Sequence, residues 1–281
     1  MRPSRPKSSR SSGLRDATGA LHGRSGNDAR IVSLVPSLTE LVCDLGLGAN
    51  LVGRTGFCVH PRALLRRVPK VGGTKHVDLD KVRALAPTHV VLNIDENEKM
   101  TAQALAQFVP HLVVTHPLAP LDNPPLYRLF GSIFGKEDAA EALCRKFDRA
   151  YAALGTAARG WPRRRVLYLI WKKPWMTVSR DTYIARTLAA AAWDTLPASA
   201  AARYPKVELN QALLASVELV LLSSEPYPFR ERDRAELCRL PGLRGKAVAL
   251  IDAEMTSWYG SRAVAGMDYL REFRVRLEAR G

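Results

Sequence analysis

The stretch IVSLVPSLTE at residues 31–40 decides the predicted fold. Its first five residues are mostly β-branched or otherwise apolar, which favours a buried strand. Pro36 and Ser37 then turn the chain into a helix, because proline suits the first helical turn and serine can cap free N–H groups. We predict that helix over 37–45, with Gly46 as its stop. A strand followed directly by a helix is the basic unit of a parallel α/β sheet.

The same alternation continues on both sides of a strand-free segment. Further strands are predicted at 51–53, 89–93, 112–115, 166–170, 219–222 and 247–251. In the segment between the two sets, apolar residues recur at spacings of four and three, namely Leu143, Phe147, Ala150, Tyr151 and Leu154. This period predicts one long amphipathic helix.

We therefore predict an α/β fold with two Rossmann-like lobes, each built on a parallel sheet, joined by one long α-helix. The expected divisions are a disordered basic tail at 1–29, an N-terminal lobe at 30–135, a linking helix at 136–160 and a C-terminal lobe at 161–281. A helix resists bending, so the lobes are expected to move little when a ligand enters between them.

The composition of the chain argues against a membrane-spanning protein and against a nucleic-acid-binding protein. The 281 residues carry 42 basic and 27 acidic side chains, a formal charge of +15, and 47% are hydrophobic. Apolar runs such as 166–171 are far shorter than the roughly 20 residues of a membrane-spanning helix, so no membrane span is expected. The basic residues form neither an aromatic-interleaved stripe nor a helix-turn-helix pattern, so no nucleic-acid partner is expected.

The N-terminal region and the cysteines bear on localisation. Residues 1–30 hold seven Arg or Lys against Asp16 and Asp28 and contain no apolar segment typical of a signal peptide. The four cysteines are scattered without a C-x-x-C pair, which suits a reducing compartment. These features predict a cytoplasmic protein. The alternative is a periplasmic protein whose assigned start is wrong, which the upstream genomic DNA would reveal.

Ligands of parallel sheets bind at the carboxyl ends of the strands. In the first lobe these ends hold Ser37, the pair Cys58 and His60, and then Glu96 and Asn97. The thiol and imidazole two positions apart are able to bind one metal or to flank a ligand. Without a third ligand nearby in the sequence, a buried cysteine and a histidine in a turn are the favoured interpretation of this pair. Glu96 and Asn97 either point into the cleft or cap the following helix.

In the second lobe the strand ends carry three aromatic clusters, at 171–176, 223–229 and 256–262. The candidate ligand-binding residues there are Trp171, Trp175, Glu225, Tyr227, Phe229, Trp258, Tyr259 and Arg262. Flat aromatic walls suit a large, flat or amphipathic ligand, although the tryptophans could instead pack the lobe interface. Arg262 would pair with an anionic ligand group or with an internal carboxylate, either Glu254 or Glu225.

Sequence templates for catalysis are missing. The patterns G-x-S-x-G, G-x-x-x-x-G-K-[ST] and H-E-x-x-H do not occur, and no G-x-G-x-x-G follows a predicted strand. We therefore expect a protein that is not an enzyme.

Two stretches, residues 31–40 and VGGTKHVDLDKVRALAPTHVV at 71–91, resemble the class III, helical-backbone substrate-binding proteins of iron-siderophore, haem and vitamin B12 importers. A branch without export signals resembles this chain further at 53–55, 57–61, 96–97, 168–171, 176–178, 223–229, 254–255 and 257–262. The resemblance implies a corrinoid or similar ligand in an aromatic cleft. It also implies permease contact through Asp80 in the first lobe, whereas the matching second-lobe position near 260–261 has no carboxylate.

The leading hypothesis is a non-catalytic receptor for a metal chelate, such as a cobalamin-like corrinoid, haem or a ferric siderophore, with no intrinsic cofactor. The aromatic residues would stack on the ligand, Cys58 or His60 would coordinate its metal, and Arg262 and Glu96 would fix polar groups. The alternative is a cytosolic metal-binding protein, metallochaperone or metal-dependent enzyme that uses Cys58, His60 and Glu96.

Overall fold

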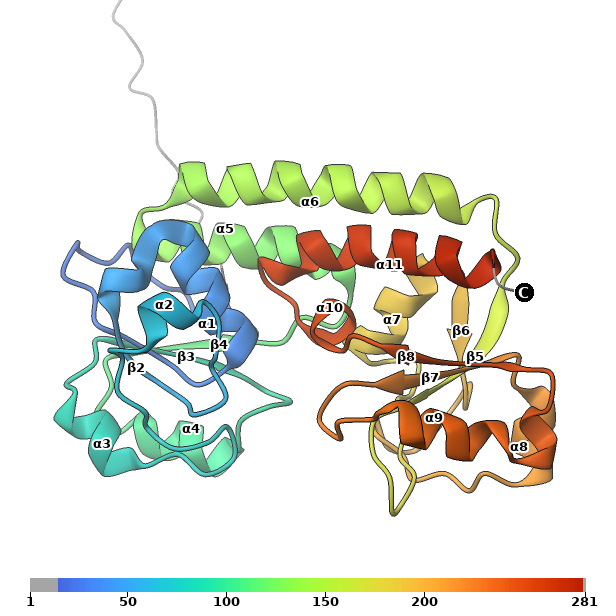
Figure 1. Ribbon diagram of the computed structural model, residues 1–281. Coiled ribbons are helices and arrows are strands. Elements are labelled where there is room, and N and C mark those ends of the chain that lie inside the picture. The colour runs from blue at the N-terminus through green and yellow to red at the C-terminus, as the bar shows by residue number, and fades with distance from the viewer. Residues whose placement is uncertain (1–14, 280–281) are drawn as a thin grey trace, which may run out of the picture.

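The computed structural model describes residues 15–279 and shows two α/β lobes bridged by helices (Figure 1). The first sheet contains β1 (Ile31–Ser33), β2 (Leu51–Arg54), β3 (His89–Asn93) and β4 (His111–Thr115) in the order β2-β1-β3-β4. The second contains β5 (Arg164–Leu169), β6 (Trp193–Thr195), β7 (Leu219–Ser223) and β8 (Ala247–Ile251) in the order β6-β5-β7-β8. All pairings are parallel. The predicted α/β fold with two parallel sheets is confirmed.

Helices cover the faces of both sheets. The N-terminal lobe has α1 (Pro36–Val42), α2 (Arg62–Leu65), α3 (Leu79–Ala84) and α4 (Lys99–Leu105), followed by α5 (Asn123–Phe134) and α6 (Glu137–Ala158). The C-terminal lobe has α7 (Tyr183–Ala190), α8 (Gln211–Ser216), α9 (Glu231–Cys238), α10 (Glu254–Ser257) and α11 (Arg262–Glu278). Single turns of other helix types occur at Cys43–Leu47, Gly48–Asn50, Pro120–Asp122 and Pro241–Leu243.

The two sheets have the same strand order and the same pattern of burial at one central strand. β3 and β7 each have neighbours on both sides, and all five residues of each strand are buried. Buried central strands of parallel sheets are apolar along their whole length, because helices cover both faces. Short strands and helices such as β6 and α10 escaped sequence prediction, since three or four residues carry no measurable period.

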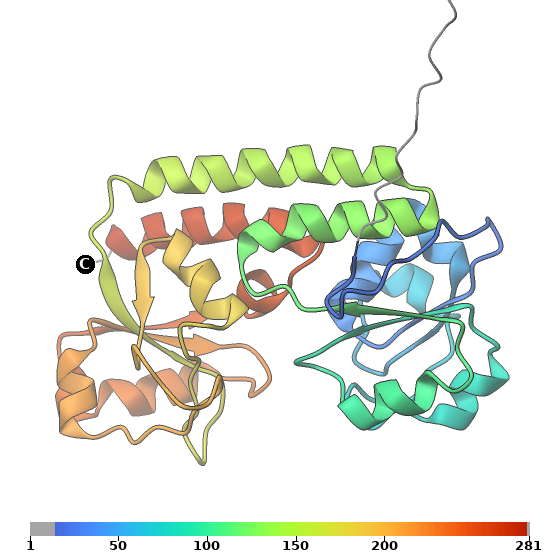
Figure 2. The same cartoon turned by 180° about the vertical axis from the view of Figure 1, so that it is seen from behind.

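The longest helix, α6, runs across both lobes, with α5 and α11 packed against it (Figures 1 and 2). Its buried residues Cys144, Phe147 and Leu154 belong to the largest hydrophobic core, which contains residues of both lobes. α5 is a separate helix that ends at Gly135, whose φ of +63° favours glycine. The link between the lobes is therefore a packed layer of three helices.

Residues 15–29 correct the prediction of a disordered tail. β4 is an edge strand, and the segment covers part of its open edge. The amide of Ala17 donates to the Val114 carbonyl at 2.9 Å, and the amide of Val114 donates to the Asp16 carboxylate at 3.1 Å. Asp16 is buried and also accepts from Thr18 and His22. The remaining part of the predicted tail, residues 1–14, lies outside the described residues.

Within residues 15–279, no helix combines the length and apolar character that crossing a bilayer requires. All four cysteines carry free thiols.

Candidate functional site

A cavity of about 510 Å³ lies between the lobes, at the carboxyl ends of the strands of both sheets. Six of the predicted site residues line it: Ser37, Glu96, Trp171, Glu225, Trp258 and Tyr259. The lining residues outside the predicted set include Lys75, Asp95, Met176, Tyr183 and Tyr204. The volume is in the range of small-molecule sites in proteins.

Aromatic side chains of the C-terminal lobe form one wall. Trp171 follows β5 and remains 39% exposed, with its ring edge-on to Tyr227 at a centroid distance of 5.8 Å. Trp258 and Tyr259 follow α10 and are almost buried. An exposed tryptophan beside two fixed aromatic rings offers apolar area to a ligand at small entropic cost.

Glu96 lies three residues beyond the end of β3, and its Oε1 accepts a 2.7 Å hydrogen bond from the Tyr259 hydroxyl of the other lobe. Burial raises the pKa of Glu96 to about 7. The Tyr259 hydrogen bond lowers that pKa, while Glu225 and Asp95 raise it by charge repulsion. The cavity thus contains a carboxyl group that titrates close to neutral pH.

Glu225 lies two residues beyond β7, the strand of the second sheet that corresponds to β3. Its Oε1 accepts a 2.7 Å hydrogen bond from the indole Nε1 of Trp258. Burial raises the pKa of Glu225, the Trp258 bond lowers it, and Glu254 and Asp252 raise it further. The two glutamates therefore occupy equivalent loops of the two lobes.

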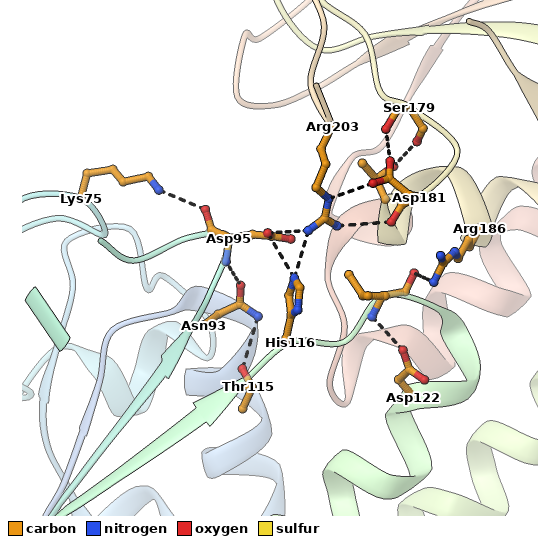
Figure 3. A network of polar contacts seen from close by, with 12 residues as sticks. Lys75, Asn93, Asp95, Thr115, His116, Asp122, Ser179, Asp181, Arg186 and Arg203 are labelled. Atoms are coloured by element: carbon orange, nitrogen blue, oxygen red, sulfur yellow. Dashed lines mark hydrogen bonds and ion pairs between the residues drawn. The ribbon is translucent and has the colours of Figure 1, made fainter. Parts of the chain in front are cut away.

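A polar network joins the lobes beside this cavity (Figure 3). Arg203 of the C-terminal lobe donates to the Asp95 carboxylate at 2.6 Å and lies 3.0 Å from the His116 ring nitrogen. Nζ of Lys75 donates to the Asp95 carbonyl at 3.0 Å. Arg203 precedes Tyr204 and comes from a loop without periodic pattern, so sequence analysis had no signal to find it. The role of Asp95 as the partner of Arg203 depends on the tertiary fold.

Cys58 does not line the cavity. Its side chain is fully buried, and its Sγ lies 3.0 Å from the Thr39 hydroxyl, which donates to it, and 3.1 Å from that of Thr55. Burial raises the pKa of the Cys58 thiol. A neutral thiol held by two threonines is a packing element, which is the second of the two readings that the sequence allowed.

His60 lies in a shallower hollow that adjoins the cavity through Glu225. Its Nε2 is 3.2 Å from Oε1 of Glu254, and its ring lies edge-on to Trp258 at 5.8 Å. Among residues 15–279, no group of three or more His, Cys, Asp or Glu side chains is arranged to hold a metal ion. This arrangement does not support a protein-bound metal at Cys58 and His60.

Asn97 supports the site without lining it. Its Oδ1 accepts from the Asn93 amide at 2.9 Å, and its Nδ2 donates to the carbonyls of Leu34 and Thr74. The buried side chain therefore ties together three loops around the cavity. Its neighbour Glu96 does not cap α4, and no side chain caps that helix.

Phe229 belongs to a core cluster of the C-terminal lobe, and the partly buried Trp175 and Tyr227 pack against that cluster. Trp175 stacks on Phe229 with an interplanar angle of 2°, and Tyr227 contacts the same ring at 4.6 Å. Their packing fixes the loops that carry Trp171 and Glu225. None of the three side chains lines the cavity, and their direct stacking on a ligand stays a prediction.

Arg262 is occupied by internal ion pairs. Its guanidinium makes two hydrogen bonds to Glu40, at 2.6 and 2.7 Å, and lies 3.1 Å from Glu254. The Glu254 pairing was one of the internal partners that the sequence suggested. Because Glu40 belongs to α1, the ion pair joins the two lobes behind the cavity.

Comparisons with known proteins agree with this architecture. The profile of the family described as periplasmic binding protein matches residues 31–245. A vitamin B12-binding protein of Vibrio vulnificus is 19% identical over 249 residues, covering 89% of this chain and 91% of that protein. A vitamin B12-binding protein of Vibrio parahaemolyticus is 24% identical over 196 residues, covering 69% and 70%.

Solved structures show the same fold. The periplasmic vitamin B12 binding protein of Vibrio cholerae superposes with a TM-score of 0.77 at 16% identity, covering 89% of this chain and 97% of that one. A periplasmic haem-binding protein of Roseiflexus gives a TM-score of 0.72 at 21% identity, covering 88% and 97%. With its profile match over most of its length and its two-lobed parallel architecture, this chain belongs to the periplasmic binding protein family.

Proposed function

We propose that this protein is a non-catalytic receptor that holds a small metal chelate in the cleft between its lobes. The observation that carries the proposal is the 510 Å³ cavity walled by Trp171, Trp258 and Tyr259 at the strand ends of both sheets. Named relatives and structural neighbours that bind vitamin B12 or haem support this ligand class. The family consists of substrate-binding proteins, which are not enzymes.

The alternative of a bare-metal protein has less support. It requires Cys58, His60 and Glu96 to act together. In the structure, each has a different partner: Thr39 and Thr55 for the thiol, Glu254 for the imidazole and Tyr259 for the carboxyl group. Its specific prediction is that Cys58→Ser abolishes binding of a bare divalent metal.

An ABC permease is the proposed partner class. Asp80 is exposed in the first turn of α3, where an arginine of another protein has access to it. Gly260 and Ser261 are buried, so the second-lobe position inferred from the sequence offers no contact surface. Any contact made by the C-terminal lobe must use other residues.

The test is a titration of the full-length protein with hydroxocobalamin, haemin and a ferric siderophore. Tryptophan quenching and the absorption spectrum of each chelate are followed together. We expect saturable binding of one chelate, at least tenfold weaker in Trp171→Ala, because this substitution removes the exposed aromatic wall. The control is Trp161→Phe, a tryptophan that packs against Arg274 outside the cavity. Failure to bind any of the three chelates would refute the proposal.

A further inference from the structure

Two glutamates of the cavity have no cation to neutralise them. Glu96 and Glu225 form no ion pair within the described residues, whereas the third acidic residue of the lining, Asp95, is paired with Arg203 at 2.6 Å. The lining lysine, Lys75, donates to a backbone carbonyl rather than to either glutamate. The lining carboxylates without an ion pair are therefore one glutamate from each lobe.

The hydrogen-bond donors to the two glutamates are neutral, and both glutamates keep spare acceptor capacity. Tyr259 donates to Oε1 of Glu96, and Trp258 donates to Oε1 of Glu225, which also accepts a longer bond of 3.5 Å from the Ser257 hydroxyl. No hydrogen bond within the described residues uses the Oε2 atom of Glu96 or of Glu225. A carboxylate has about four acceptor positions, so both side chains retain capacity to accept bonds from a ligand.

The equivalent positions of the two residues matter for a ligand that touches both lobes. Glu96 follows β3 and Glu225 follows β7, the corresponding strands of the two sheets. A chelate bound in the cavity therefore meets an acceptor from each side. A carboxylate on its periphery would lose its hydration next to a like charge, which disfavours binding. An amide N–H or an ammonium group would satisfy the acceptors.

We propose that Glu96 and Glu225 are specificity-determining residues that select a chelate with hydrogen-bond donors on its periphery, such as carboxamides, against one with carboxylates. The inference rests on the proposed function, since it concerns the same cavity and the same class of ligand. Within one ring system, corrin or porphyrin, it favours carboxamide arms over free carboxylates. It is independent of which ring or metal the protein prefers.

Matched ligand pairs test this selection. The first pair is dicyanocobinamide, which carries carboxamide arms, and dicyanocobyrinic acid, the same corrin with carboxylate arms. The second is haemin bis-amide and haemin. For the ring that binds, we expect the amide form to bind the full-length protein at least about tenfold more tightly than the acid form at pH 8.

Variants of Glu96 and Glu225 test whether these two residues cause the preference for the amide form. In Glu96→Gln combined with Glu225→Gln, the ratio of acid-form to amide-form Kd is expected to fall by about tenfold or more. Glutamine keeps an acceptor for the Tyr259 and Trp258 donors, so the local structure has a substitute for each bond. Glu98→Gln is the matched control, because Glu98 is exposed and lies outside the lining.

The outcomes are distinguishable. Equal or tighter binding of the acid form by the wild-type protein overturns the selection and leaves the receptor function standing. A preference for the amide form that persists unchanged in the double variant also overturns it. Absence of saturable binding for both ring systems and for a ferric siderophore overturns the receptor function, and the selection with it.

Discussion

The hydroxyl of Tyr259 in the C-terminal lobe donates a 2.7 Å hydrogen bond to Glu96 in the N-terminal lobe, inside the cavity between them. The next residue, Gly260, donates its amide to Oδ1 of Asn123 at 2.7 Å and has a φ of +80°. A Cβ atom there would lie 3.1 Å from the Ser37 carbonyl oxygen. The Tyr259 donor is thus held at a close junction of the lobes, and the charge state of Glu96 depends on that junction.

Glu96 makes the stability of the protein depend on pH. Its pKa is raised from 4.5 to about 7 by burial, so the folded state binds more protons than the unfolded state between these values. Stability contributed by this group is therefore present at low pH and falls as pH rises from about 4.5 to 7. Relative to wild type, Glu96→Gln should gain stability over this window, by at most about 3 kcal/mol at pH 8. Urea unfolding at pH 4, 6 and 8 measures the difference.

The control for this measurement is Glu98→Gln, which removes an exposed carboxylate two residues away. Its difference from wild type should stay nearly constant with pH. If Glu96→Gln also shows a constant difference, the pKa of Glu96 in the folded protein is not raised.

Tyr259→Phe removes the one hydrogen bond that lowers the pKa of Glu96. We expect this pKa to rise further above about 7 and the free energy of unfolding to fall by about 1 kcal/mol. Carboxyl ¹³C NMR of protein labelled in glutamate follows the titration, with Glu96→Gln used to assign the resonance. An unchanged titration midpoint would show that the hydrogen bond does not stabilise the ionised form.

The thiols should differ sharply in reactivity. Cys238 on α9 is exposed, whereas Cys58 is fully buried and burial raises its pKa. Because the thiolate is the reactive form, a thiol reagent at pH 8 should label Cys238 first and leave Cys58 unmodified until the protein unfolds. Mass spectrometry of labelled peptides makes the measurement. Fast labelling of Cys58 would instead place its thiol on an accessible surface.

The sequence predicted the elements that depend on strong local patterns. The strands at 89–93 and 247–251 have the predicted bounds. The first is buried between two neighbouring strands, and the second pairs with β7 at the edge of its sheet. Parallel order then implied that their carboxyl ends meet, and six predicted residues line the cavity found there. The family and the fold follow from features of this kind.

The roles of single side chains depended on partners far away in the sequence. Arg262 pairs with Glu40, 222 positions away, and a spacing of that size has no local signature. Trp175 and Phe229 were expected in the cleft because they follow strands, yet they stack on each other and do not line the cavity. A strand end predicts where a residue lies, but neighbouring side chains decide whether it reaches the ligand.

Breaking the Arg203 contact should loosen the loop that carries Tyr204. Arg203 bridges to Asp95 and His116 of the other lobe at partly buried positions (Figure 3). In Arg203→Ala, we expect faster amide hydrogen exchange in residues 198–206 and a loss of stability of about 1 kcal/mol or less. Arg234→Ala, which removes an ion pair within α9, is the control and should not change exchange in this loop. Unchanged exchange in Arg203→Ala would show that the contacts of Arg203 with the other lobe do not hold this loop in place.

Substitution of Arg262 tests whether this residue stabilises the folded protein or binds the ligand. Its side chain is only 14% exposed and contacts Glu40 and Glu254, so Arg262→Met removes the guanidinium from two carboxylates near the lobe junction. Loss of one partner from a largely buried ion pair costs about 3 kcal/mol or more. Arg128→Met, which removes the exposed pair with Glu141, should cost less than about 1 kcal/mol.

Chemical denaturation compares the stability of the two variants, and ligand titration below their unfolding transitions compares their affinities. Because internal carboxylates occupy the guanidinium of Arg262, Arg262→Met should bind the chelate with a Kd within about threefold of wild type, despite its lower stability. A large loss of affinity in a fully folded Arg262→Met protein would return Arg262 to the ligand-binding residues. Equal stability losses in the two variants would instead show that burial adds nothing to the interlobe ion pair.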